Sequence, residues 1–405
     1  MRRNKFSAIL GIAILVIMSL TLTGAAYAQG NFKVIHSFGC DDGNYLDHGV
    51  TLDAAGNLYG VTHEYGCGMG LGAVFKLTPN ADGSWAESVI HIFYGPPDAY
   101  PPTSGVIFDA DGNLYGTGFD GGDYGWGAVY RLTLNSDGSW SETIIHSFDG
   151  GDDGRWPYGL VFDAAGNLYG TTSDQGLYGW GTVYKLTPES NGSWTETILY
   201  QFTSGSDGGA PNGPLVFDNA GNLYGTAGDY YLTPGCIFRL TPQPDGSWTE
   251  RVLYTFTDGR DGRVPYGLMR DASGNFYGMT QGGTYGYGTI FQLKPNPGGG
   301  SRVQVLHQFT GGKDAASPSA LMSDAAGYLY GLTSTGGTNR QGTAFQMRPS
   351  SGAGWTLREL HQFGPWKSGV EPTGLISDAA GNFYGTTWAG GADGLGTVFQ
   401  FKPGK

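Results

Sequence analysis

The 405-residue sequence lacks the patterns that identify common enzymes and helical proteins. Charged residues make up 14% of the chain, and it has three cysteines. It contains no G-x-S-x-G elbow, H-E-x-x-H motif, P-loop or dinucleotide fingerprint. Beyond the N-terminal leader, no segment repeats apolar residues every 3.6 positions, so we expect no helices. The sequence therefore predicts an all-β fold and gives no motif from which to assign a reaction.

Basic residues are also scarce. The chain has 22 Lys and Arg against 35 Asp and Glu, a net charge of −13 that becomes more negative once the basic leader is removed. Nucleic acids and anionic membrane surfaces are densely negative, so this charge argues against both as partners. The 73 glycines follow no three-residue period and aromatics reach 14%, which excludes collagen and a disordered chain.

The first 28 residues have the features of a secretory leader. Basic residues stand at positions 2, 3 and 5, an apolar run covers about 8–22, and Ala26-Tyr27-Ala28 gives the small-x-small cleavage pattern. We expect a signal peptide over 1–28, cleaved before Gln29; an uncleaved anchor is the alternative. No second apolar run follows, so we expect a secreted, periplasmic or cell-surface protein without a membrane span after cleavage.

One octet, DAAGNLYG at 53–60, recurs through the rest of the chain at intervals of 53 to 56 residues. Its leading Asp stands at positions 53, 109, 163, 218, 271, 324 and 378. Each unit holds four strand-like segments, which we name a to d from inner to outer; in the third unit they cover 159–163, 167–172, 181–188 and 194–202. Seven such units predict a single domain over 29–405, a seven-bladed β-propeller of four-stranded antiparallel blades.

The two chain ends predict how the ring closes. Residues 31–38 match segment d alone, and the C-terminal GTVFQFKP matches segment c. We therefore expect the N-terminal strand 31–38 to complete the C-terminal blade, which leaves no open sheet edge in the ring.

The repeated sequence motifs also resemble those of a known family. D-x-x-G-N-[LF]-Y-G, then G-[TA]-V-[FY]-x-L-T-P, then G-S-W-x-E-T is similar to the GloVer tandem repeat of secreted bacterial proteins, and more distantly to NHL-type propeller repeats. The resemblance covers the whole mature chain. It implies an exported, propeller-like repeat protein, and it brings no established activity and no catalytic residues.

The octet itself predicts a structural turn between a and b. Its Asp can accept bonds from backbone N–H groups, and Gly166 supplies a left-handed conformation. We expect the following Tyr, such as Tyr169, to pack between blades, and the next Gly to let neighbouring sheets approach. One carboxylate per turn is a poor Ca²⁺ ligand set, which argues against seven metal sites. The periodic His of segment d, replaced by Tyr in two copies, is interpreted as a packing residue.

Strand parity places the loops on two rims. The a–b and c–d loops share one, here called the uniform rim, because the copies agree there. The b–c and d–a loops share the other, the variable rim, where binding residues are expected. Its aromatic side chains could stack on sugar rings, or could only cover the blade ends. These candidate ligand-binding residues are Tyr124, Trp126, Trp156, Tyr158, Tyr178, Trp180, Tyr266, Tyr285 and Tyr287.

The d–a loops are also acidic. The stretches 149–154 (DGGDDG) and 258–262 (DGRDG) are rich in oxygen ligands, so Ca²⁺ is the ion they would suit, although neither completes an EF-hand. The alternative is a solvated turn in which Arg155 or Arg263 pairs with a neighbouring Asp. We expect no cofactor to be required.

The first unit departs most from the others. Cys40 and Cys67 both fall on the variable rim and are expected to form a disulfide; Cys236 occupies a segment-c position and is expected to be buried and free. The only non-periodic histidines are also in this unit. Together with flanking acids they form a candidate metal or acid–base cluster of Asp47, His48, His63 and Glu64.

The sequence favours a binding or interaction module over an enzyme, with a glycan or a surface protein as partner. The alternatives left open are a carbohydrate-active or lactonase-like enzyme at the channel mouth, and a structural surface or matrix protein. Converging polar groups with shifted pKa values would favour the enzyme, and a shallow aromatic patch would favour the binding module.

Overall fold

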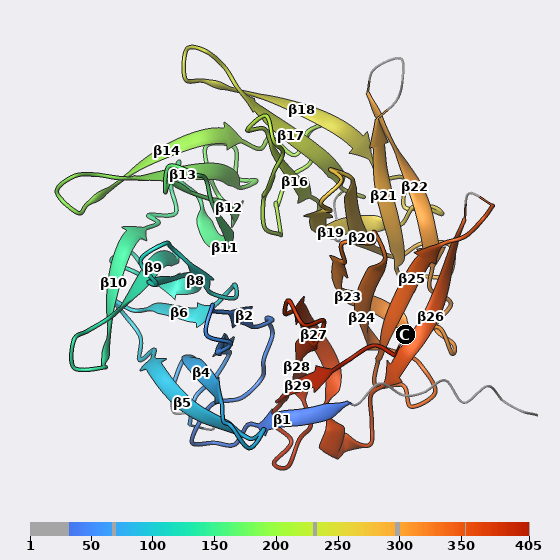
Figure 1. Ribbon diagram of the computed structural model, residues 1–405. Helices are drawn as coiled ribbons and strands as arrows, with labels where there is room; N and C mark the ends of the chain where they lie inside the picture. Colours follow the sequence, from blue (N-terminus) through green and yellow to red (C-terminus); the bar gives the residue numbers. More distant parts are fainter. Residues whose placement is uncertain (1–31, 67–69, 230–232, 296–299, 353, 405) are drawn as a thin grey trace, which may run out of the picture.

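The computed structural model describes residues 32–404 apart from 67–69, 230–232, 296–299 and 353. Seven antiparallel sheets stand around a central opening, so the predicted seven-bladed all-β propeller is confirmed (Figure 1). The leader, residues 1–28, lies outside the described residues and remains a prediction. None of the helices in the described ranges has the length and apolar character needed to cross a membrane.

Blades are numbered along the chain. Blade 1 comprises β2 (Thr51–Leu52), β3 (Leu58–Thr62), β4 (Ala73–Pro79) and β5 (Trp85–Ile92). Blade 2 comprises β6 (Ala99–Pro102), β7 (Ile107–Phe108), β8 (Leu114–Gly121), β9 (Ala128–Leu134) and β10 (Trp140–Ser147). Blade 3 comprises β11 (Arg155–Phe162), β12 (Leu168–Asp174), β13 (Thr182–Pro188) and β14 (Trp194–Gln201). Blade 4 comprises β15 (Val216–Phe217), β16 (Leu223–Ala227), β17 (Cys236–Pro242) and β18 (Trp248–Thr255).

The remaining blades follow the same order. Blade 5 comprises β19 (Arg263–Arg270), β20 (Phe276–Gln281), β21 (Thr289–Pro295) and β22 (Ser301–Gln308). Blade 6 comprises β23 (Ala316–Ser323), β24 (Leu329–Thr335), β25 (Thr343–Pro349) and β26 (Trp355–Gln362). Blade 7 comprises β27 (Val370–Ser377), β28 (Phe383–Ala389), β29 (Thr397–Phe401) and β1 (Lys33–Ser37). A single 3-10 turn, η1 (Trp366–Ser368), precedes β27.

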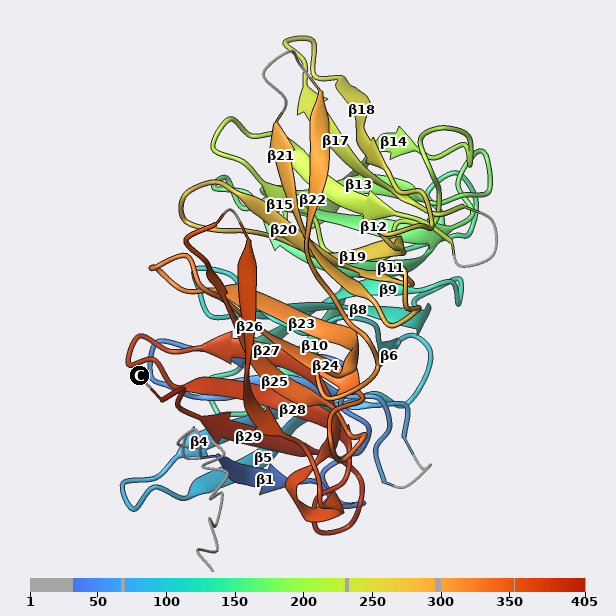
Figure 2. The same ribbon diagram turned by 90° about the vertical axis from the view of Figure 1, so that its right-hand side faces the viewer.

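The ring closes as the sequence predicts. β1 pairs antiparallel with β29, from Lys33 opposite Gln400 to Ser37 opposite Thr397. The first described strand therefore lies beside the last one, which Figures 1 and 2 show as blue against red. Closing the ring through a shared blade ties the two ends of the chain together.

The hydrophobic core is divided among the seams between blades. The described residues form seven clusters, each drawn from two adjacent blades. At the first seam the Tyr59 ring of blade 1 lies edge-on to Phe108 and Trp140 of blade 2. The octet tyrosine thus packs between blades, as the sequence analysis expects.

The glycine that follows this tyrosine has a different role from the one expected. In blade 5, Gly278 on β20 is paired with Phe291 on β21, and a Cβ at Gly278 would lie 2.5 Å from Cζ of Phe291. The ring that requires the glycine belongs to the adjacent strand of the same blade, not to a neighbouring sheet. The expectation that this Gly lets sheets approach is therefore wrong: a buried aromatic ring covers it.

The octet's acidic residue organises the a–b turn. In blade 3, Asp163 Oδ1 accepts from the backbone N–H of Ala165 and of Asn167, both at 2.9 Å. Its Oδ2 accepts from Asn167 Nδ2 at 2.7 Å and from the Tyr169 hydroxyl at 3.0 Å. Partial burial opposes ionisation, but the hydrogen bonds from Asn167 and Tyr169 hold the pKa of Asp163 below its usual value. Both carboxylate oxygens therefore accept hydrogen bonds within the turn, as expected of a structural residue.

The periodic His of strand d packs as the sequence analysis expects. His146 lies edge-on to Phe148, with ring centroids 4.6 Å apart, and Tyr200 meets Phe202 in the same way. In blade 6, His361 also stacks on Phe32, with centroids 3.8 Å apart. Burial lowers the pKa of His361 to about 4.

Acid should destabilise the protein through His361. Its folded pKa lies below the unfolded value of 6.5, so only the unfolded state takes up this proton as the pH falls from about 6.5 towards 4. The stability lost amounts to about 3 kcal/mol. We expect His361→Tyr, the residue found in this slot at Tyr200, to remove that loss. Urea unfolding of both proteins at pH 7 and pH 4.5 measures it.

A matched control for His361 is His63. A hydrogen bond to Asp47 raises the pKa of His63, so its contribution is present at low pH and lost as the pH rises. His63→Gln should therefore change the pH dependence in the opposite direction. Equal pH dependence in the wild type and the His361→Tyr protein would show that His361 is not buried in its neutral form.

Candidate functional site at the channel mouth

One residue from each blade lines the central channel on the variable-rim side. Each follows the proline or leucine near the start of strand a, so the same local geometry presents seven side chains of varied chemistry. They enclose, with their neighbours, a cavity of about 450 Å³. The seven channel residues are Asp47, Thr103, Tyr158, Asn212, Tyr266, Ser319 and Thr373.

Four of these channel residues form a belt of hydrogen bonds from blade to blade. Each hydroxyl donates to the backbone carbonyl near the start of strand a in the next blade. Thr103 bonds to Pro157 O at 2.7 Å and Ser319 to Pro372 O at 2.6 Å. Thr373 bonds to Leu46 O at 2.7 Å, and the Tyr266 hydroxyl donates to Pro318 O. The belt fixes the channel wall, because each of these side chains is held by two adjacent blades.

A second cavity, of about 670 Å³, opens at the channel mouth between blades 5 and 6. It shares Asp47, Tyr266, Ser319 and Thr373 with the channel, so the two are continuous. We call this second cavity the mouth cavity. Its other polar lining residues include Asp258, Arg263, Gln281, Ser317 and Ser334. Loops b–c and d–a both contribute, which agrees with the expected division of loops between the rims.

Tyr287 is the aromatic wall of the mouth cavity. It packs against Gly311 and keeps 45% of its surface exposed. Tyr285 lies in the same loop and is 56% exposed, but it does not line the cavity. Asp258 accepts a 3.1 Å bond from Arg263, so an ion pair lines the same cavity as the ring. This combination of a ring, an ion pair and several hydroxyls is typical of small-ligand sites of this size.

Three aromatic residues of blades 2 and 3, Phe119, Trp126 and Trp156, form a closed stack instead. Arg155 lies over Trp126 at 4.9 Å and over Trp156 at 4.1 Å, and Trp156 stacks on Phe119 at 4.8 Å. Asp174 holds the Arg155 guanidinium through its Nε at 2.9 Å. Both faces of Trp156 are therefore covered by protein groups.

The nine aromatic candidates thus divide by environment. Tyr158 and Tyr266 line the channel, and burial raises the pKa of both hydroxyls. Trp180 packs against Gly209, while Tyr124 and Tyr178 extend into solvent at 62% and 54% exposure. Of the nine, the structure brings Tyr266 and Tyr287 together at one cavity.

The candidate cluster of blade 1 is only partly assembled. His63 Nδ1 lies 2.8 Å from Asp47 Oδ2, whereas Glu64 accepts a 3.2 Å bond from Asn44. Burial lowers the pKa of His48, and the hydrogen bond to Asp47 raises that of His63. Within the described residues, these four do not form a three-ligand group. The geometry favours a His63–Asp47 ion pair at the edge of the channel.

The acidic d–a loops are held internally. Asp207 Oδ2 accepts from Thr203 N at 2.8 Å and from the Tyr200 hydroxyl at 2.9 Å, and Asp261 does the same one blade later. Arg263 pairs with Asp258 of its own d–a loop, as the solvated-turn alternative predicts, whereas Arg155 pairs with Asp174 at the end of β12.

Cys236 is free and buried, as predicted. Burial raises the pKa of its thiol to about 12, so it is an inert packing group. Cys67, the predicted disulfide partner of Cys40, lies outside the described residues, and the pairing stays a prediction.

Sequence reasoning missed several residues of the variable rim. Phe119, Gln281 and Ser334 occupy one slot, directly after the five buried residues that begin strand b. In other blades the slot holds residues as different as His63 and Trp388. That disagreement within an otherwise repeated strand is the signal that could have identified the rim residues.

A larger cavity, of about 1150 Å³, lies on the uniform rim between blades 1 and 2. Octet residues such as Asp53 and Asp109 line it, and their carboxylates are engaged in the turns. Since most of its lining recurs at each seam, we assign it to the architecture and not to a specific site.

The fold and this site define a β-propeller repeat protein with a polar, aromatic-walled cavity at its channel mouth. The chain belongs to the Gloeobacter/Verrucomicrobia repeat family, whose model matches residues 69–269 and 230–405. The resemblance noted in the sequence is thereby confirmed. No curated protein matches the chain.

Solved structures share the fold. The extracellular domain of a one component system from B. thetaiotaomicron is 15% identical, with TM-score 0.57, over 94% of this chain and 43% of that one. The extracellular domain of a hybrid two component system from the same organism is also 15% identical, with TM-score 0.55. The match covers 92% of this chain and 42% of that one. The chain thus spans less than half the length of either. A protein described as an oxidoreductase (glucose dehydrogenase) from Thermus thermophilus is 17% identical over 76% of this chain and 96% of that one, with a TM-score of 0.44.

Proposed function

We propose that the protein is an exported binding module that takes a carbohydrate in the mouth cavity of its variable rim. The observation that carries the proposal is that the half-exposed Tyr287 ring and the Asp258–Arg263 pair line one cavity of about 670 Å³. Sugar rings have apolar C–H faces that stack on aromatics and hydroxyls that bond to charged and amide groups. The leader-like N-terminus supports action outside the cytoplasm, where glycans are exposed.

The channel belt supports binding more than catalysis. Its hydroxyls donate to backbone carbonyls, so they are committed to holding the ring. A wall fixed in this way loses little conformational freedom when a ligand binds. We therefore assign no reaction to the cavity.

Tyr287→Ala should weaken carbohydrate binding about tenfold, a loss of roughly 1.4 kcal/mol from one stacking contact. A glycan array of the mature protein identifies the ligand, and titration calorimetry with that ligand measures the affinity. Asp258→Asn should also weaken binding, because it removes a carboxylate that lines the cavity.

Tyr285→Ala is the matched control, since it removes a similarly exposed ring from the same loop outside the cavity. Its affinity should equal that of the wild type. Equal losses from both tyrosine variants, or from neither, would place the binding surface away from the mouth cavity.

A further inference from the structure

The seams between blades carry a second set of chemical groups, near the outer edge of the ring. At each seam three positions meet: the strand-d His or Tyr of one blade, a position of its d–a loop that is Asp in every blade except blade 6, and the residue four places before the strand-d His or Tyr of the next blade. The Glu at this third position belongs to the repeated motif G-S-W-x-E. This motif recurs with the same period as the strand-d His.

The seams differ in what these positions hold. His, Asp and Glu meet at three seams: His36, Asp42 and Glu87; His91, Asp98 and Glu142; His146, Asp153 and Glu196. The next seam has Tyr200 in place of His. The remaining seams replace the Glu by Val303, Leu357 and Phe32.

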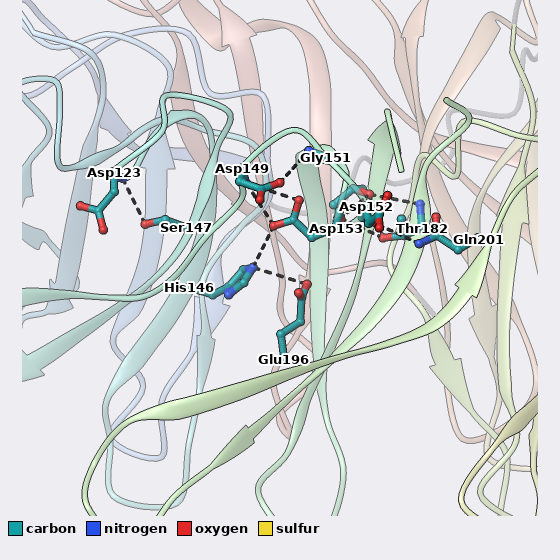
Figure 3. A network of polar contacts seen from close by, with 11 residues as sticks. Asp123, His146, Ser147, Asp149, Gly151, Asp152, Asp153, Thr182, Glu196 and Gln201 are labelled. Carbon is teal, nitrogen blue, oxygen red and sulfur yellow. Dashed lines mark hydrogen bonds and ion pairs between the residues drawn. The ribbon is translucent and has the colours of Figure 1, made fainter. Parts of the chain in front are cut away.

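At the seam of blades 2 and 3 the three side chains point at one another (Figure 3). His146 Nε2 lies 3.5 Å from Asp153 Oδ2 and 3.4 Å from Glu196 Oε1. Both His146 Nε2 and Glu196 Oε1 are buried, and neither has a hydrogen-bond partner among the described residues. Two atoms that could complement each other are thus held close together without a hydrogen bond between them.

These separations match those between ligands of one ion. Ligands about 2.0–2.1 Å from a tetrahedral Zn²⁺ lie about 3.3–3.4 Å from each other. The seam of blades 1 and 2 repeats the arrangement: His91 Nε2 lies 3.2 Å from Glu142 Oε2, and Asp98 completes a set within 4.8 Å. The Glu142 side chain is only 9% exposed, and His91 Nε2 likewise lacks a hydrogen-bond partner in the described chain.

The charge at these seams favours a cation. At the seam of blades 2 and 3, Asp149 adds a third carboxylate, and its backbone N–H donates to Asp153 Oδ2 at 3.0 Å. The side chains of Asp153 and Glu196 are only 13% and 17% exposed, so water screens their negative charges poorly. A divalent ion would compensate both carboxylates at once.

Other seams are closed by direct hydrogen bonds between the same positions. Tyr200 donates to Asp207 at 2.9 Å, which closes that seam by a hydrogen bond. His36 lies 2.6 Å from Asp42 and is hydrogen-bonded to it, so the last His–Asp–Glu seam is closed by a direct pair. In the described residues, three-ligand groups occur only at the seams of blades 1/2 and 2/3.

We propose that each of these two seams binds one divalent transition-metal ion of the Zn²⁺ type through His Nε2, the loop Asp and the Glu of the next blade. The imidazole ligand distinguishes this ion from Ca²⁺, which prefers oxygen ligands alone. Each ion would join two blades, outside the mouth cavity and independently of any ligand there.

The zinc content of the mature protein tests the proposal. The protein is stripped with EDTA, reloaded with zinc and dialysed, and the zinc it retains is measured by inductively coupled plasma mass spectrometry. We expect two ions per chain, one after His146→Tyr and none after His91→Tyr with His146→Tyr. Tyr occupies this slot in two blades, so the variants should fold, which their far-ultraviolet circular dichroism checks.

His307→Tyr is the matched control, because that seam has His and Asp but Leu357 in place of Glu. It should leave two ions bound. Zinc retention unchanged by the His91 and His146 variants, no retained zinc in the wild type, or zinc lost only on His63→Ala would each overturn the proposal.

Discussion

Gly278→Ala should destabilise the propeller by about 3 kcal/mol, although alanine normally improves a strand position. The added Cβ would lie 2.5 Å from Cζ and 3.0 Å from Cε1 of the fully buried Phe291 ring. The ring cannot retreat, because it packs in the seam with Tyr224 and Phe256. The midpoint of urea unfolding at unchanged slope measures this loss.

Gly352→Ala is the control, since a Cβ there meets nothing within 4 Å. Its unfolding midpoint should stay close to the wild-type value, because surface substitutions usually change stability by less than about 0.5 kcal/mol. Similar midpoints for both variants would mean that the glycine opposite each strand-c ring is not required by packing.

Asp163→Ala should cost about 2–3 kcal/mol, because it removes the acceptor of four hydrogen bonds in a partly buried turn. The Tyr169 hydroxyl and the Asn167 amide would lose their partner at the seam. Because the pKa of Asp163 is lowered in the fold, the difference from the wild type should be full at neutral pH and shrink only below about pH 4. Urea unfolding at pH 7 and at pH 3.5 measures both parts.

Asp137→Ala is the matched control for this turn. Asp137 accepts from the Ser139 N–H and hydroxyl in the exposed c–d turn of blade 2. Water can replace those bonds, so its midpoint should move far less than that of Asp163→Ala. Equal shifts would show that the a–b turn has no special role in the blade.

Much of the fold could be predicted because it is repeated. The octet period, four strand segments per unit and the split blade each follow from comparing copies within one chain. Gly278 shows the limit: its need for a glycine depends on Phe291, which stands opposite it on the next strand. Register across strands is a property of the folded sheet, so the sequence analysis assigned the wrong neighbour to this glycine.

The site was less predictable, for a related reason. Tyr266 and Tyr287 were candidates because they are aromatic and lie on the variable rim, but so was Trp156, whose faces Arg155 and Phe119 cover. Gln281 and Ser334 come from different blades and meet at one cavity only through the ring. The seam Glu196 was overlooked because its partner His146 lies one whole repeat away, on another blade.

We therefore infer that the repeated residues stabilise the fold, and that the residues that differ between copies bind the ligand. The most direct test compares Asp163→Ala and Tyr287→Ala, measuring for each the unfolding midpoint and the affinity for the array-identified carbohydrate. We expect Asp163→Ala to lower stability with unchanged affinity, and Tyr287→Ala to lower affinity about tenfold with unchanged stability. Lost affinity in the folded Asp163→Ala protein, with full affinity in Tyr287→Ala, would contradict this division and place the binding site on the uniform rim.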